Sequence, residues 1–399
     1  MEIYKSKQKN LYKGKNIKKS RNKKSNDIEI KNYYCFVLKL FLIIIFLCKT
    51  KTKVNIINYI KNENHYKNFE IMKKIFNNDT FVKSYLDNIT ILNHTYNKKY
   101  KNLKKNKNNI NICVNLNDNY VYKLIVSMES VLSNCNKQKT FITYHVLCAP
   151  EVNENTLIIL KSFMKRYSLN LEMIFYNMGN NFIFLSHRRY TQVTYYRLLL
   201  PIFINLDRIL YLDGDTLTYK DISEIFQLDF NDNYVLGTLD YYSFGVDYLG
   251  LKSDRYINAG VILMNLEKIR NDKKYYDLIN ITNNVILKND DQTAINYVLY
   301  PKIGQFPIKT NVFIFYDQSD INIYLNYLRV KINETQIEEA LYDPMIIHSV
   351  GGPKFWDSNH KSFNCSKKKD CSCNNYQCIW YSYANKTDYY QEIISSIKK

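Results

Sequence analysis

The chain has 399 residues, 46% of them hydrophobic, so it can bury the core of one large domain or two ordinary ones. Its formal net charge of +19 suggests a nucleic-acid partner, but residues 1–110 hold 26 Lys and Arg against 7 Asp and Glu. Residues 111–399 hold 30 of each. A neutral body argues against a basic groove for a nucleic-acid backbone, and we predict no nucleic-acid partner.

In the N-terminal region a lysine-rich stretch is followed by an apolar run, the arrangement of a membrane-targeting segment. Residues 1–32 carry ten lysines and predict a basic cytosolic tail. Within 33–48, the apolar run Cys35–Cys48 is interrupted by Lys39; it is shorter than the about 20 residues of a typical bilayer span. A signal-anchor and a cleaved signal peptide both fit, and the anchor is favoured because no small-residue cleavage site follows. The lysines predict a single-pass type II protein of the Golgi or endoplasmic reticulum membrane, with the rest of the chain in the lumen.

Two further segments flank residues 109–360. Residues 49–108 are rich in Lys and Asn and lack Gly and Pro, which predicts a partly disordered or helical stem. Residues 361–399 form a cysteine-containing tail, whose spacing lacks the paired C-x2-C of structural zinc sites. Disulfides are therefore predicted for Cys365, Cys371, Cys373 and Cys378 if the compartment is oxidising.

Residues 109–360 are predicted to form one α/β domain with a mostly parallel sheet, because strands and helices alternate along it. Strands are predicted at 111–116, Phe141–Cys148, Leu171–Tyr176, Arg208–Leu212, Val235–Asp240, Ile257–Asn265 and Met345–His348. Helices are predicted at Tyr120–Ser133, Asn153–Tyr167, Thr194–Pro201 and Asp291–Tyr300, and a long helix is predicted within Glu267–Lys288.

The first chemical signal is YLDGDTL at 211–217. Asp213 and Asp215 are two residues apart in extended backbone, so their carboxylates point the same way. They follow an apolar strand at the edge where open α/β sheets bind ligands. Oxygen ligands of this kind suit Mg²⁺ or Mn²⁺ holding a diphosphate. Gly214 between them lets a phosphate or ribose approach the backbone closely.

The second signal is IIHSVGGPKFW at 346–356. His348 ends an apolar strand, and Gly351 begins a tight turn that leads to Lys354. A histidine at a strand end is usually structural, but an imidazole also fits as a third metal ligand. Lys354 can meet a diphosphate across the glycines.

These segments, in this order, resemble glycosyltransferase family 8. The resemblance spans NICVNLNDNYVYKLIVSMESVL, VTYYRLLLP, DRILYLDGDTLTYKDISEIFQLDF, YINAGVILMNLEKIR, DDQTAIN and HSVGGPKFW. It implies a single nucleotide-diphospho-sugar transferase (GT-A type) domain with a Rossmann-like front half. It also implies a retaining, metal-dependent hexosyltransferase that uses a UDP-sugar, Mn²⁺ or Mg²⁺, and a glycan, lipid or protein acceptor.

The resemblance also implies roles for particular residues. The residues matching uracil and ribose contacts are Asn115, Asn117, Asn119 and Tyr120, with Asn117 where the family often has Asp. The residues matching the metal ligands are Asp213, Asp215 and His348, and those matching the diphosphate turn are Gly351 and Lys354. The residues matching the lining of the donor sugar are Asp240, Asn258, Ala259 and Asp291. Arg197 matches an arginine near sugar and phosphate, and Gln292 the residue nearest the anomeric carbon; Gln292, Asp291 and Arg197 are the predicted catalytic residues.

Other interpretations remain for single residues and for the whole chain. Asp240 and Asn258 are also typical of caps and turns, and Asp291 of a helix N-terminus. The alternative function is an inert descendant that binds a sugar nucleotide or a partner through the same fold. The complete set of Asp213, Asp215, His348 and Lys354 argues against it.

Overall fold

The computed structural model describes residues 63–94, 107–167, 169–180, 184–185, 192–240, 244–251, 254–314, 318–351, 354–357 and 376–397. The predicted cytosolic tail and the predicted anchor at 33–48 lie outside these residues. Among the helices that are described, none has the length and apolar character needed to cross a membrane.

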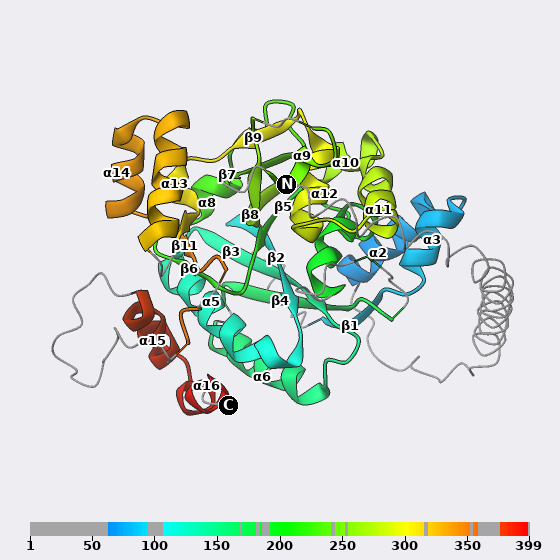
Figure 1. Ribbon diagram of the computed structural model, residues 1–399. Helices are drawn as coiled ribbons and strands as arrows, with labels where there is room; N and C mark the ends of the chain where they lie inside the picture. Colours follow the sequence, from blue (N-terminus) through cyan, green and yellow to red (C-terminus); the bar gives the residue numbers. More distant parts are fainter. Residues whose placement is uncertain are drawn as a thin grey trace, which may run out of the picture. The chain divides into compact units, whose positions relative to one another are not determined.

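The central element is an eight-stranded sheet in the order β1-β4-β3-β2-β5-β8-β7-β9 (Figure 1). Its strands are β1 (Thr90–His94), β2 (Asn108–Leu116), β3 (Thr140–Cys148), β4 (Leu171–Asn177), β5 (Arg208–Leu212), β7 (Val235–Leu239), β8 (Ile257–Asn265) and β9 (Ile303–Gln305). Strands β4, β3, β2 and β5 run parallel, whereas β8 is antiparallel to both β5 and β7. The prediction of a mostly parallel sheet therefore describes the front half, and the far half is mixed.

Helices cover both faces of the sheet, and its inner strands are therefore largely buried. All nine residues of β3 are buried, as expected for a strand enclosed on both sides. On one face, Ile142 and Tyr144 pack with α5 (Val121–Asn134) and α6 (Glu154–Arg166). The predicted helices match these two closely, and the Asn153 side chain accepts the Thr156 N–H to cap α6.

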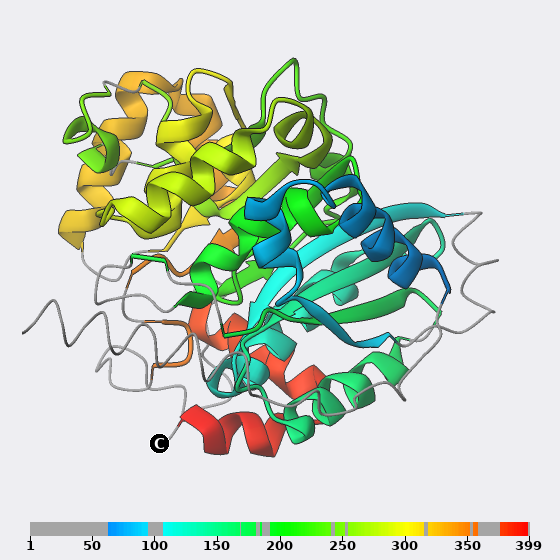
Figure 2. The same ribbon diagram turned by 90° about the vertical axis from the view of Figure 1, so that its right-hand side faces the viewer.

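The other face carries a larger group of helices. Leu147, on the opposite side of β3, joins a hydrophobic cluster with residues of these helices. They are α2 (Glu63–Ile75), α3 (Thr80–Leu86), the 3-10 helix η2 (Gln192–Leu199), α7 (Leu200–Phe203), α10 (Leu266–Asn271), α11 (Lys274–Asn284) and α12 (Asp290–Leu299). Figure 2 shows α2 and α3, in blue, against the strands.

A second sheet lies beside the large one. It has three strands, in the order β10 (Val312–Phe313), β11 (Ile346–His348) and β6 (Thr216–Thr218). A third hydrophobic cluster joins it to α13 (Gln318–Lys331), α14 (Glu334–Tyr342) and α15 (Tyr376–Lys386), with α16 (Tyr390–Ile397) beside α15. Short elements complete the described fold: η1 (Asp118–Tyr120), α8 (Ser223–Phe226), α9 (Phe244–Asp247) and η3 (Ile308–Thr310).

Three features differ from the sequence-based expectations. Part of the predicted stem packs on the body, since β1 pairs with β4 and Phe69 and Met72 are buried in its core. Within Glu267–Lys288, where one long helix is predicted, the structure has two helices, because Lys273 adopts a left-handed conformation at φ +53° between them. The helix predicted at Thr194–Pro201 is largely a 3-10 helix.

Candidate active site

Strand pairing brings the three predicted metal ligands together. Asp213 directly follows β5, and Asp215 directly precedes β6. His348 ends β11, where it is paired with Thr216 in β6. The Ser349 N–H donates to the Asp215 carbonyl oxygen at 3.1 Å, which ties the two segments beyond the ladder. Residues more than 130 positions apart in the sequence thus share one edge of the fold.

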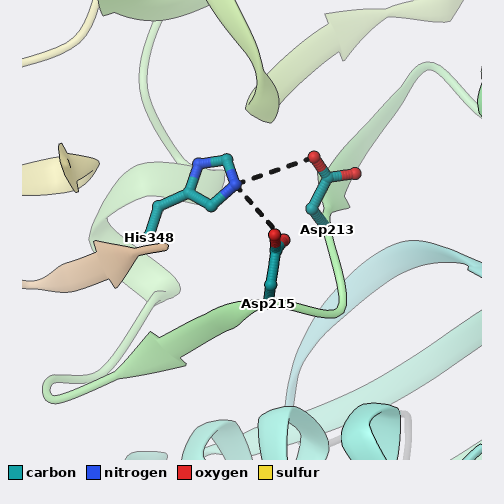
Figure 3. Close-up of side chains that lie close together, drawn as sticks. All are labelled: Asp213, Asp215 and His348. Atoms are coloured by element: carbon teal, nitrogen blue, oxygen red, sulfur yellow. Dashed lines mark ion pairs between the residues drawn. The ribbon is translucent and has the colours of Figure 1, made fainter. Parts of the chain in front are cut away.

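The side chains converge on one point (Figure 3). His348 Nε2 lies 3.8 Å from Asp213 Oδ2 and 3.3 Å from Asp215 Oδ1. One ligand atom from each residue lies within 4.8 Å of the others. The Asp213 Oδ1 atom is already engaged, accepting from the Tyr211 hydroxyl at 2.8 Å and from Arg197 at 3.1 Å. Asp213 therefore keeps its second oxygen on the side of the imidazole.

The arrangement depends on Gly260 in β8. A Cβ atom there would lie 2.2 Å from His348 Cε1 and 2.6 Å from Asp213 Oδ2. The Asp213 N–H donates to the Gly260 carbonyl oxygen at 2.8 Å, so the two backbones are held at this separation. Only a residue without a side chain leaves room for both ligands.

Lys354 neutralises part of this acidic cluster. Its Nζ atom lies 2.5 Å from Asp215 Oδ2 and donates to the Ser349 carbonyl oxygen at 2.6 Å. Burial by itself raises the pKa of the Asp215 carboxyl, but Lys354 and His348 outweigh it and hold that pKa below its usual range. Asp215 is therefore a carboxylate with one oxygen on a cationic side chain and the other facing the imidazole.

Arg197 is buried beside the Asp213, Asp215 and His348 cluster and contacts several of its neighbours. Its guanidinium lies 3.1 Å from Asp213 Oδ1 and 3.0 Å from Asp291 Oδ2, and it donates to the Ala259 carbonyl oxygen at 2.5 Å. It also stacks over the Tyr211 ring at 3.7 Å from the centroid. Burial opposes its charge, but Asp291, Tyr211 and Asp213 raise the pKa of Arg197 above its ordinary value. Arg197 thus holds two carboxylates in place.

Asp291 is the second of these carboxylates. Burial raises its pKa to about 7, opposed by Arg197 and assisted by repulsion from Asp213 and Asp290. Asp290 precedes it in a left-handed conformation at φ +43° and accepts from the Tyr195 hydroxyl at 2.6 Å. Two adjacent buried acids therefore begin α12, and at Asp291 burial outweighs the helix N–H groups, which by themselves favour negative charge.

The opposite wall consists mainly of amides. Gln292 Nε2 donates to Asp240 Oδ2 at 3.2 Å, and Gln292 Oε1 accepts from the Ala259 N–H at 3.0 Å. Asn258 Nδ2 lies 3.1 Å from Asp240 Oδ2 and 3.2 Å from Gln292 Oε1, as donor to both. Asn311 donates to Asn258 Oδ1 at 3.1 Å. The amide orientations on this wall are therefore determined by their neighbours.

Both walls enclose one cavity of about 350 Å³. Most of the predicted site residues line it, together with Thr194, Gly260, Asn289, Asp290 and Val350. The predicted residues that line it are Arg197, Asp213, Asp215, Asp240, Asn258, Ala259, Asp291, Gln292, His348, Gly351 and Lys354. A concave pocket on which several polar groups converge is typical of a ligand site.

The predicted nucleoside contacts lie outside that lining. Asn115, at the end of β2, donates to the Val193 carbonyl oxygen at 2.8 Å and to the Tyr211 hydroxyl at 3.0 Å. Asn117 precedes the short helix η1, and Asn119 is an exposed residue within that helix. The Asn117 Oδ1 and Asn115 Oδ1 atoms are buried and accept no hydrogen bond from a described residue.

Tyr120 occupies the space over Gly214. A Cβ atom on Gly214 would lie 2.7 Å from Tyr120 Cε1, so the glycine admits the tyrosine ring to this position. The ring also meets Trp356 edge-on at a centroid distance of 5.6 Å. The close approach expected at Gly214 for a phosphate or ribose is thus made by an aromatic side chain.

Two residues of the site were missed although the sequence held a signal for each. Tyr211 lies two residues before Asp213 in a strand, so its side chain points to the same side. It donates to Asp213 and stacks with Arg197. Gly260 interrupts a run of apolar residues in a strand, which indicates a close approach of another group.

The chemistry of the donor set fits a divalent cation. Two carboxylates and an imidazole offer the oxygen and nitrogen ligands that Mn²⁺ accepts, and the space opened by Gly260 lies directly against two of them. The His348 Nε2 atom faces the carboxylates. The Nδ1 atom of the same ring is buried and makes no hydrogen bond with a described residue.

Comparisons with known proteins agree with this geometry. Residues 111–360 match the family model described as glycosyl transferase family 8. General stress protein A of Bacillus subtilis is 26% identical over 259 residues, an alignment covering 61% of this chain and 86% of that protein. The lipopolysaccharide 1,3-galactosyltransferase of Salmonella typhimurium is 25% identical over 264 residues, covering 62% of this chain and 73% of that protein.

A solved structure shares the fold. It is the galactosyltransferase LgtC in complex with donor and acceptor sugar analogs, with a TM-score of 0.51 and 20% sequence identity. The match covers 70% of this chain and 96% of LgtC. Together with the family match over most of the body, this identifies the mixed α/β fold as that of nucleotide-sugar transferases. The chain belongs to glycosyltransferase family 8 and is a glycosyltransferase.

Proposed function

We propose that the protein transfers a hexose from a UDP-sugar to a hydroxyl group of a glycan, lipid or protein, with retention of the anomeric configuration. One observation carries this proposal. A single cavity has the carboxylate–imidazole cluster and Lys354 on one side and the Gln292 amide network on the other. The first suits a diphosphate with its cation, and the second suits a sugar.

The side of the cavity that carries the carboxylate–imidazole cluster and Lys354 would bind the leaving group. Asp213, Asp215 and His348 would hold Mn²⁺ or Mg²⁺, which when bound supplies Lewis-acid neutralisation of the diphosphate. Lys354 would leave Asp215 and place its charge on a phosphate oxygen as the UDP departs. Arg197 would act through Asp213 and Asp291, since its guanidinium is already shared between them.

The amide wall would position the sugar. Gln292 and Asn258 are both held by Asp240, so the two amides would present a wall of fixed orientation to the sugar. We propose that the bond between the anomeric carbon and the phosphate oxygen breaks first. The acceptor oxygen then attacks from the same face, and its proton passes to the departing phosphate. Gln292 would steady the reacting centre without forming a stable bond.

The decisive experiment is a donor-hydrolysis screen of the protein against a panel of UDP-sugars with Mn²⁺. A transferase releases UDP from one donor in preference to the others, because slow transfer to water needs no acceptor. The inert-descendant alternative predicts UDP binding without release from any donor. GDP- and ADP-sugars serve as matched controls for the base.

We further propose the N-in topology that the lysine-rich segment and the run at 33–48 suggest, with the catalytic domain in the lumen of the Golgi or endoplasmic reticulum. Protease protection in sealed microsomes tests it. Digestion of residues 109–360 from the outside would contradict it.

A further inference from the structure

The loop that carries Lys354 has few hydrogen bonds of its own. It leaves β11, passes through Gly351 at φ +73°, and reaches Asp357. Among its described residues, the Lys354 N–H donates to Asp357 Oδ2 at 2.7 Å and the Asp357 N–H to the Lys354 carbonyl oxygen at 3.0 Å. These bonds shape a single turn, which is attached to the body by the Lys354–Asp215 ion pair and by the burial of Phe355 and Trp356 in the third hydrophobic cluster. The position of the turn must come from its neighbours.

Helix α15 supplies two such contacts. Trp356, in the loop, lies 5.8 Å from Trp380 between ring centroids, and Trp380 is 1% exposed. The Gln377 side-chain amide donates to the Asp357 carbonyl oxygen at 3.0 Å. Trp356 is thus held between α15 on one side and Tyr120 on the other.

The tail that bears α15 is itself attached to the site. The Tyr383 hydroxyl donates to the Thr218 carbonyl oxygen at 3.2 Å and accepts from Asn134 at 2.7 Å. Thr218 ends β6, the strand that begins directly after Asp215. Ile393 of α16 is completely buried, and Cys378 is held in a disulfide. One segment therefore touches both the strand beside a metal ligand and the loop of Lys354.

We propose that the C-terminal helices, residues 376–397, are part of the donor-binding apparatus, with Trp380 and Gln377 as positioning residues for the Lys354 loop. This rests on the proposed function, in which Lys354 meets the diphosphate. The segment lies outside residues 111–360, the part of the chain that matches the family model. The C-terminal helices set the affinity for UDP because they fix the position of the loop from which the Lys354 side chain extends.

The test is calorimetry of UDP with Mn²⁺ on the full chain and its variants. Trp380→Ala and Gln377→Ala should weaken UDP binding, by about tenfold or more for the tryptophan, because small displacements of a binding group are costly. Trp380→Phe should restore most of the affinity, since an aromatic ring again supports Trp356. Phe163→Ala is the matched control: it removes a buried ring of α6 and lowers the unfolding temperature, but should leave UDP affinity unchanged.

A second measurement does not depend on UDP. Hydrogen exchange of residues 349–357 should be faster in Trp380→Ala and Gln377→Ala than in Phe163→Ala. The chain has two tryptophans, so the emission of Trp380→Phe comes from Trp356 alone and reports the loop directly. If wild-type protein fails to bind UDP, the proposed function is wrong and exchange decides whether α15 holds the loop. Unchanged exchange in both tail variants, or equal loss of UDP affinity in Phe163→Ala, overturns the inference.

Discussion

The two walls of the cavity are built on different principles. The wall of Asp213, Asp215 and His348 is ionic, and in this structure the ammonium of Lys354 sits against Asp215 at 2.5 Å. The wall of Gln292 and Asn258 is largely neutral, and its amides are hydrogen-bonded to one another and to Asp240. An ionic wall gains most when a cation and an anion arrive together, whereas an amide wall offers direction with little charge. Substitutions should therefore separate donor affinity from turnover.

The largest loss of donor affinity is expected for Asp215→Asn. The amide keeps the shape but removes the charge that faces both His348 and Lys354, so metal-dependent UDP binding should be abolished. Calorimetry with UDP and Mn²⁺ measures it. Asp232→Asn is the control, since it removes an equal charge from an exposed pair with Lys268 and Lys302. Unchanged affinity in Asp215→Asn would place the metal elsewhere.

The next largest effect is expected for Gly260→Ala, as a loss of Mn²⁺ affinity. Its methyl group would overlap the positions of His348 and Asp213, so Mn²⁺ binding should fall sharply while the protein still folds. Gly304→Ala is a matched control, because its methyl group would meet Leu236 at 2.3 Å, away from the cluster. Direct Mn²⁺ titration compares them. Equal metal affinity in the two variants would mean that the ligands move aside freely.

Lys354→Ala should weaken UDP binding by about 10- to 100-fold, because a charge-assisted contact is worth roughly 1.5–3 kcal/mol. Turnover should fall too, since the phosphate contact exists before and during the reaction. Affinity for Mn²⁺ without UDP should not decrease, because the variant removes a cation that competes for Asp215. A parallel loss of metal affinity would show that Lys354 only maintains the cluster.

The smallest change in UDP affinity is expected for Gln292→Ala. Its partners are Asp240, Asn258 and the Ala259 N–H, all on the sugar side of the cavity. Steady-state kinetics should show turnover reduced by about 10²-fold at nearly constant UDP affinity, the pattern of lost transition-state stabilisation. Normal turnover would remove Gln292 from the mechanism while leaving the ionic wall intact.

Local sequence patterns were enough for the front half of the fold and for the ionic wall. The predicted strands Arg208–Leu212 and Ile257–Asn265 have the same bounds in the structure. The apolar runs before Asp213 and His348 placed both residues at strand ends. The extended backbone expected for Asp213 and Asp215 is instead a turn at Gly214 and Asp215, and His348 reaches the two aspartates because β11 pairs antiparallel with β6.

What the sequence by itself determined is therefore the family, the alternating strands and helices, and most of the groups that line the cavity. Tertiary structure alone decided that Gly260 makes room for His348, that part of the predicted stem packs on the core, and that Trp380 supports Trp356. The physical reason is the range of the interactions. A strand or helix is encoded in neighbouring residues, whereas close packing is a property of side chains that only the folded chain brings together.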